Sequence, residues 1–205
     1  MGKSDLFSYL SAFVTIVLAV AITDMIQSTH RLIRCRGRIK WDAAPLLFAA
    51  VVAATVVSEF FSLWDLFDVS KISFARLMWI LSIPTLFALL AYSVLPDEVP
   101  AEGLDLREFY VAERKSWIVI YATASLLDVV RSVDAVNVLA DRYHHPEWLR
   151  EYLAYTARYL PLIAIGLWLM WWGRSRKWDL SGVLLLAAAA IYGMAEWTIR
   201  ARPGV

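Results

Sequence analysis

The sequence predicts an all-α integral membrane protein, a bundle of six transmembrane helices. Hydrophobic residues make up 60% of its 205 residues and charged residues only 19%, whereas soluble domains average about 45–50% apolar and about 25% charged residues. The apolar residues are gathered into stretches of about 20, which is the length that crosses a bilayer as a helix. Short polar connectors separate these stretches, so the pattern favours membrane spans over a single buried core.

The expected spans follow one another in a single transmembrane domain, residues 1–205. They cover about residues 6–27, 44–66, 74–95, 117–139, 149–172 and 180–197. The first connector is strongly basic, and residues 96–115 are expected to form the longest loop. Pro84 and Pro161 fall inside spans, where each predicts a kink whose freed carbonyls neighbouring helices can satisfy.

Lysine and arginine residues predict the orientation, because cytoplasmic connectors carry an excess of both. Six spans place both termini on the same side of the membrane. The first, third and fifth connectors hold eleven lysine and arginine residues, and the opposite side holds seven. We therefore expect a multi-pass protein of the cell (cytoplasmic) membrane with both termini outside the cytoplasm.

Charged residues inside the predicted spans are the most informative feature of the sequence. On insertion scales each one costs about 2.5–3.5 kcal/mol at the centre of a helix, so each calls for a reason. A rise of about 1.5 Å per residue allows their depths to be estimated. Seven charges from five spans fall on the outer side of the midplane: Glu59, Arg76, Asp128, Arg131, Asp134, Arg158 and Glu196.

Helical phase gives two of these spans a polar face. In the second span that face holds Thr55, Ser58, Glu59, Ser62 and Asp65, opposite the aromatic residues Phe60, Phe61, Trp64 and Phe67. In the fourth span the aligned polar residues are Tyr121, Ser125, Asp128, Arg131 and Ser132. Arg131 is three residues from both Asp128 and Asp134, so either pair can neutralise its charge. Such faces point toward protein or water, and the aromatic face toward lipid or a neighbouring helix.

Two interpretations of this charge cluster are open. The four acids and three arginines nearly cancel, so they can form a purely structural ion-pair network. They can equally line a water-filled vestibule, open to the outside, that admits an ion or a small polar solute. Glu59, Asp128, Arg131 and Arg158 are the leading candidates for that role. The acids would coordinate a cation or relay protons, and the arginines would set selectivity or neutralise the resting site.

Asp24 lies apart from the cluster, near the cytoplasmic end of the first span. It shares a helix face with Gln27, Ser28 and Arg31, whereas Ser8, Ser11 and Thr15 lie almost opposite. No continuous polar track therefore crosses this helix, and we expect Asp24 and Arg31 to form an ion pair at the membrane boundary.

A weak internal similarity links the two halves of the chain. Residues 24–28 (DMIQS) resemble residues 128–132 (DVVRS) at equivalent points of the first and fourth spans. Two halves of three spans each would be inverted relative to one another, as in several transporter folds. Only the Asp and the Ser match, so chance is the simpler explanation of this possible 3+3 inverted repeat.

The sequence contains no motif of an enzyme or a cofactor site. P-loop, G-x-G-x-x-G, G-x-S-x-G and H-E-x-x-H patterns are all missing. The single cysteine, Cys35, excludes an internal disulfide and a cysteine-based metal site. His30, His144 and His145 sit at or beyond opposite span ends, which argues against a haem pair. We expect no catalytic residues, cofactor or metal, and the net charge of +1 does not indicate a nucleic-acid partner.

Residues 10–34 (LSAFVTIVLAVAITDMIQSTHRLIR) carry a resemblance to known sequences. Together with the basic connector and the Trp- and Phe-rich second span, they resemble uncharacterised bacterial multi-pass inner-membrane proteins. The resemblance covers mainly the first third of the chain. It implies a bacterial cytoplasmic membrane and no particular activity.

The leading functional hypothesis is a small channel- or transporter-like protein, a homo-oligomer in the lipid bilayer, with an outward-facing charged cavity for an ion or small polar solute. The alternative is a non-catalytic membrane sensor or assembly subunit. In that case the charge cluster is a structural ion-pair network and the basic connectors dock a partner.

Overall fold

The computed structural model describes residues 3–62, 73–173 and 175–200 of the chain. It contains six helices, which are α1 (Lys3–Arg34), α2 (Ala43–Ser62), α3 (Phe74–Ser93), α4 (Leu106–Tyr143), α5 (Glu147–Trp172) and α6 (Arg176–Arg200). Each of the six is long and apolar enough to cross a membrane. The predicted all-helical architecture is confirmed, and its six apolar helices are compatible with a multi-pass membrane protein.

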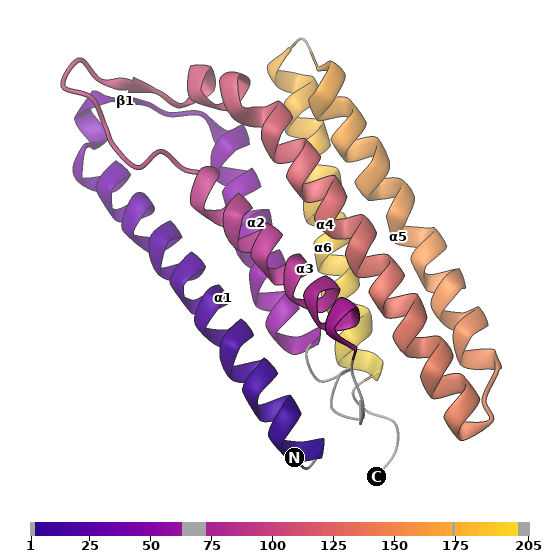
Figure 1. Ribbon diagram of the computed structural model, residues 1–205. Coiled ribbons are helices and arrows are strands. Elements are labelled where there is room, and N and C mark those ends of the chain that lie inside the picture. The colour runs from indigo at the N-terminus through magenta and orange to yellow at the C-terminus, as the bar shows by residue number, and fades with distance from the viewer. Residues whose placement is uncertain (1–2, 63–72, 174, 201–205) are drawn as a thin grey trace.

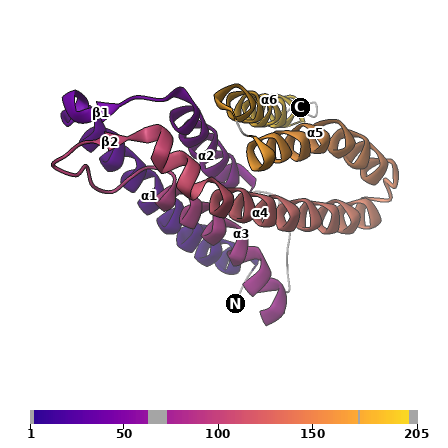
Figure 2. The ribbon, with the colours of Figure 1, turned by 90° about the horizontal axis from the view of Figure 1, so that it is seen from above.

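The six helices run side by side, and the start of α1 lies at the same end of the bundle as the last turns of α6 (Figure 1). We call this the terminal end. The opposite, connector end holds the α5–α6 turn and the first and third connectors. Seen from above, α1 and α3 lie on one side and α5 and α6 on the other (Figure 2). α2 and α4 join the two sides, because α2 packs against α1, α3 and α6, and α4 against α3 and α5.

The first and third connectors are tied together at the connector end. Strands β1 (Ile39–Lys40) and β2 (Leu104–Asp105) form a short parallel pair in which Ile39 lies opposite Leu104. Gly103 precedes β2 with φ +103°, and a Cβ atom there would lie 2.7 Å from the carbonyl oxygen of Arg38. Only glycine fits such a left-handed backbone at so close an approach.

Helix α4 is much longer than the predicted span, 117–139. It has 38 residues, and residues 106–115, expected to belong to the longest loop, form its first turns. The carboxylate of Asp105 explains this start, because it accepts hydrogen bonds from the backbone N–H groups of Arg107 (2.9 Å) and Glu108 (3.3 Å). The expected loop was wrong because hydropathy marks the part of a helix that lies in lipid, not where the helix begins. At about 1.5 Å per residue, α4 exceeds the hydrocarbon thickness of about 30 Å.

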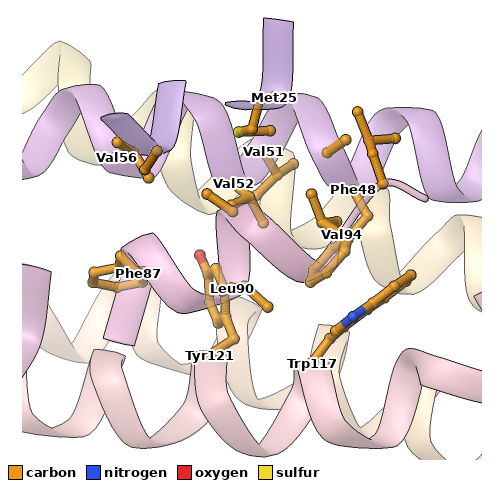
Figure 3. Packing of buried hydrophobic residues seen from close by; sticks show 14 of the residues in the cluster. Met25, Phe48, Val51, Val52, Val56, Phe87, Leu90, Val94, Trp117 and Tyr121 are labelled. Carbon is orange, nitrogen blue, oxygen red and sulfur yellow. The ribbon is translucent and has the colours of Figure 1, made fainter. Parts of the chain in front are cut away.

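The apolar core lies between α2, α3 and α4 (Figure 3). The ring of Phe48 stacks on Trp117 with centroids 5.7 Å apart, and Tyr121 meets Phe87 edge to face at 6.0 Å. Val52 and Leu90 fill the space between these rings and are fully buried. This packing fixes α4 against α2, and it thereby sets which α4 side chains can reach the charges of α2.

Helices α5 and α6 approach each other closely at two glycines. A Cβ atom on Gly166 would lie 2.9 Å from the carbonyl oxygen of Gly182, and one on Gly182 would lie 2.6 Å from that of Gly166. Small residues at helix crossings allow backbones to pack directly in a membrane protein. The crossing holds α6 beside α5 and brings the first turn of α6 to the start of α4.

Candidate functional site: an interhelical charge network

Arg131 of α4 is the centre of a buried network that joins α4 to α2. Its Nη1 lies 3.3 Å from Oε2 of Glu59, and its Nη2 donates to the hydroxyl of Ser62 at 3.0 Å. Its Nη2 also pairs with the carboxylate of Asp128, three residues earlier on α4. The Ser62 hydroxyl lies 3.3 Å from Glu59 Oε2 and closes the arrangement. We call Glu59, Ser62, Asp128 and Arg131 the terminal-end network.

The local helix geometry explains how these residues meet. Glu59 and Ser62 are three residues apart and therefore share a face of α2, while Phe60 and Phe61 lie on the exposed side at 41% and 43% exposure. This is the two-sided helix that the sequence predicts. Thr55 and Ser58 of the same predicted face are partly buried, whereas Asp65, Trp64 and Phe67 lie outside the residues that the structure describes.

Asp134 extends the polar region to a third helix. Its carboxylate pairs with Arg76 Nη2 of α3 at 2.6 Å, and both side chains are partly exposed. The sequence offered Asp134 as a second partner for Arg131, and the structure gives Asp134 a partner on another helix. This contact could not be read from helical spacing, because Arg76 and Asp134 are 58 residues apart.

The charged residues of this region differ widely in exposure. The side chain of Asp134 is 44% exposed, that of Asp128 31%, that of Arg131 9% and that of Glu59 7%. The carboxylate of Glu59 is thus the most buried charged group of the terminal-end network, and Arg131 links it to the partly exposed Asp128.

Helix α5 adds a stripe of uncharged polar residues. Tyr152 and Thr156 are buried, and Tyr159 continues the same face at helical spacing. The Tyr155 ring packs on Tyr159 at a centroid distance of 4.9 Å and stacks on Tyr192 of α6 at 5.6 Å. Tyr159 is also within electrostatic range of Asp128. Reasoning from charge does not identify these tyrosines, although Tyr152, Tyr155 and Tyr159 are spaced by three and four residues in the sequence.

Arg158 and Glu196 are the remaining charges of the predicted outer cluster, and Asp65 belongs to the predicted polar face of the second span. Arg158 lies on the exposed side of α5. Glu196 belongs to α6, but its side chain lies outside the described residues, as does the whole of Asp65. Of the seven charges expected in the outer cluster, the structure brings together Glu59, Asp128 and Arg131, and joins Asp134 to Arg76.

A second charge network lies at the connector end, among residues that the sequence places in the connectors. Asp179, in the first turn of α6, is fully buried, and its two oxygens pair with Arg107 Nη2 (2.5 Å) and Arg114 Nη1 (2.6 Å) of α4. Arg176 Nε lies 3.0 Å from the buried carboxylate of Asp42. In the sequence these residues are evident only as connector charges, and no local spacing predicts that they pair. Asp179 meets Arg107 and Arg114 across 72 and 65 residues of chain.

A pocket of about 710 Å³ opens at the connector end beside α1. Its lining residues are Asp24, Arg31, Cys35, Asp97, Glu98 and Val99. Arg31 Nη1 donates to the carbonyl oxygen of Asp97 at 2.7 Å, so the guanidinium expected to pair with Asp24 is turned toward the third connector. Oδ2 of Asp24 is buried and has no hydrogen-bond partner among the described residues.

The described residues contain no group of three His, Cys, Asp or Glu side chains that could hold a metal ion. Comparison with known protein families, with curated proteins and with solved structures found no match to this chain. The resemblance of its first third to bacterial multi-pass proteins therefore stays a prediction, and the function has to be argued from the geometry.

Proposed function

We propose that this protein is a small channel- or transporter-like membrane protein that handles an ion or a small polar solute through the terminal-end network. The observation that carries the proposal is the buried carboxylate of Glu59, which Arg131 links to the partly exposed carboxylate of Asp128. A carboxylate buried between membrane helices is energetically costly, and intramembrane acids commonly mark ion pathways. Asp134, on the same helix as Asp128 and nearer the terminal end, extends the series of acids toward that end.

The network gives Arg131 and Glu59 complementary roles. Two carboxylates, Glu59 and Asp128, face one guanidinium, which leaves the group one negative charge in excess. In the resting state Arg131 occupies the place that a cation would take. A cation or proton that reaches Asp128 and then Glu59 competes with Arg131 for the same oxygens. Leaving either charge unpaired in the interior is strongly unfavourable. Binding of the cation or proton is therefore coupled to displacement of Arg131.

The cellular setting follows from the charge distribution of the connectors. We propose that the protein lies in the bacterial cytoplasmic membrane with the basic connector end inside, so that the terminal end and its network face outward. We also propose that the first three helices and the last three are related as inverted repeats. Asp24 of the first half and Asp128 of the second lie toward opposite ends of the bundle, as such a relation requires. We also propose a homo-oligomer. Buried side chains around Trp117 fill the single bundle between Glu59 and the connector end, so a continuous pathway would have to run between subunits.

Glu59→Gln tests the transport proposal. Proteoliposomes loaded with a pH-sensitive dye, or with dyes for Na⁺ or K⁺, report flux after an ion gradient is imposed. We expect the variant to fold and to lose the flux that the wild type shows, because glutamine cannot carry the charge or the proton. Glu113→Gln, on the exposed surface of α4, is the matched control and should keep the wild-type rate. Equal flux in the wild type, Glu59→Gln and empty liposomes would contradict the proposal.

One observation favours the alternative of a non-catalytic sensor or scaffold subunit. Arg131 contacts Glu59, Asp128 and Ser62 at the same time. These contacts would also hold α2 against α4 if the network had a purely structural role. On this alternative, Glu59→Gln lowers the detergent melting temperature, and neither variant carries flux. Measuring melting temperature and flux on the same preparations separates the two functions.

A further inference from the structure

A stripe of hydrogen-bond donors runs along the buried face of α4 at the connector end. Arg107, Tyr110, Arg114 and Trp117 are spaced by three, four and three residues, so they lie on one side of the helix. Tyr110 and Trp117 are fully buried, and the side chains of Arg107 and Arg114 are 26% and 13% exposed. We call these residues the α4 donor stripe.

Each residue of the α4 donor stripe has a buried polar atom without a partner. These atoms are Arg107 Nη1, Tyr110 OH, Arg114 Nε and Trp117 Nε1, and none of them has a hydrogen-bond partner among the described residues. All of them can donate a hydrogen bond, and only the tyrosine hydroxyl can also accept one. Buried donors in folded proteins are nearly always satisfied. What is missing along this stripe is therefore an acceptor.

The charge of the surroundings indicates which kind of acceptor fits. Arg107 and Arg114 share a single carboxylate, that of Asp179, which leaves one positive charge in excess. The nearby Asp42 does not offset it, because its oxygens bind Arg176 and the backbone N–H of Ala44. A water molecule could satisfy the donors but would leave the excess charge, whereas a singly charged anion satisfies both.

The geometry around Tyr110 places its hydroxyl within this charged group. Arg107 Cζ lies 5.5 Å from the centre of the Tyr110 ring, and the hydroxyl is within electrostatic range of Arg107, Arg114 and Asp179. Asp179 uses one terminal nitrogen of each guanidinium and so holds both arginines in place. Their remaining nitrogens, Arg107 Nη1 and Arg114 Nε, stay available.

We propose that the α4 donor stripe binds a phosphate oxyanion, with Arg107, Tyr110 and Arg114 as donors and Asp179 as the residue that orients the arginines. Guanidinium groups match the geometry of phosphate oxygens, and a phosphodiester carries the single negative charge that the cluster lacks. The phosphate can belong to a lipid headgroup or to free inorganic phosphate. This site is separate from the terminal-end network, so it does not depend on the proposed transport function.

Thermal unfolding of the purified full-length protein tests the proposal and distinguishes the two phosphate sources. In detergent, inorganic phosphate is titrated against sodium chloride at equal ionic strength. In nanodiscs, phosphatidylglycerol, whose phosphodiester leaves the headgroup with one net negative charge, is compared with phosphatidylcholine, whose choline cation neutralises its phosphodiester. A ligand that binds only the folded state raises the melting temperature in a saturable way. A rise with phosphate beyond that with chloride identifies the free ion, and a rise with phosphatidylglycerol alone identifies the lipid headgroup.

Tyr110→Phe is the decisive variant, because it removes one hydroxyl and keeps the buried ring. We expect it to fold as well as the wild type and to bind phosphate at least several-fold more weakly. Tyr92→Phe, a partly exposed tyrosine of α3, is the matched control and should respond as the wild type. Arg107→Gln should abolish the response, and binding of radiolabelled phosphate or retained lipid provides a second readout if that variant is less stable. The proposal is overturned if neither source raises the melting temperature, or if Tyr110→Phe and Arg107→Gln both respond like the wild type.

Discussion

At the scale of single residues, the two charge networks differ in how completely their members are paired. Arg131 has three partners on two helices, so removing any one of them leaves a charge with fewer contacts in the interior. Asp179 is saturated by Arg107 and Arg114, which themselves keep unpartnered nitrogens. This contrast is why we assign a mobile ion or solute to the first network and a bound anion to the second.

Asp105, which caps α4 outside the membrane-spanning segment, gives a prediction for pH dependence. Partial desolvation raises the pKa of its carboxyl. The backbone N–H groups of Glu108 and Arg107 and the charge of Lys40 outweigh that effect, so the pKa lies below its ordinary value. A lowered folded-state pKa means that the charge stabilises the fold above the unfolded-state pKa of about 3.9 and ceases to do so as the pH falls through the folded-state value.

Asp105→Asn isolates this charge, because asparagine caps helices about as well as aspartate. We expect the wild type to melt at a higher temperature than the variant near pH 6, with the difference shrinking below about pH 4. Melting curves in detergent from pH 3 to 7 measure it, with Asp141→Asn on the exposed surface as control. A difference that grows on acidification would refute the assignment.

At the scale of the helices, close backbone packing holds α6 in register with α5 and α4. A Cβ atom on Gly182 would lie 2.6 Å from the carbonyl oxygen of Gly166, whereas one on Gly193, farther along the same helix, would meet only the Tyr155 hydroxyl at 3.5 Å. The first contact cannot be relieved by rotating a side chain, and the second is an ordinary van der Waals distance. The two glycines of α6 are therefore not equivalent.

Gly182→Ala should lower the free energy of unfolding by about 1–3 kcal/mol, as overpacking of a well-packed contact typically does. Gly193→Ala should leave it nearly unchanged or raise it slightly, because alanine favours the helix. Reversible unfolding in mixed detergent micelles measures both. Equal stability of the two variants would mean that α5 and α6 are not in direct backbone contact there.

At the scale of the whole molecule, the arrangement of connectors predicts a fixed orientation in the membrane. Cys35 is the only cysteine of the chain and lies next to the basic η1 turn (Arg36–Arg38), at the connector end. His144, which ends α4 with a left-handed backbone, lies at the terminal end. A single cysteine, either Cys35 or one introduced in place of His144, can therefore report on which side of the membrane its end of the bundle lies.

We expect a membrane-impermeant maleimide to label Cys35 only after the cells are permeabilised. In a Cys35→Ser background, His144→Cys should be labelled in intact cells, because the proposed orientation places the terminal end outside. The Cys35→Ser chain without a new cysteine controls for background. The reverse labelling pattern would place the terminal-end network on the cytoplasmic side and would require solute access from within.

The sequence by itself determined the number and order of the helices and the two-sided character of α2. These properties depend on composition and on local periodicity, which a bilayer imposes directly on the chain. It also predicted the Asp128–Arg131 contact, because residues three apart on a helix are neighbours in any fold.

Only the tertiary structure decided which charges meet between helices. Glu59 and Arg131 are 72 residues apart, as are Arg107 and Asp179, and Arg76 and Asp134 are 58 apart. Their pairing follows from how the helices cross at Trp117 and at the two glycines of α5 and α6, a result of packing that no single helix encodes. The connector-end network and its unpartnered donors are hidden in the sequence for the same reason, and its arginines are evident there only as basic residues of the connectors.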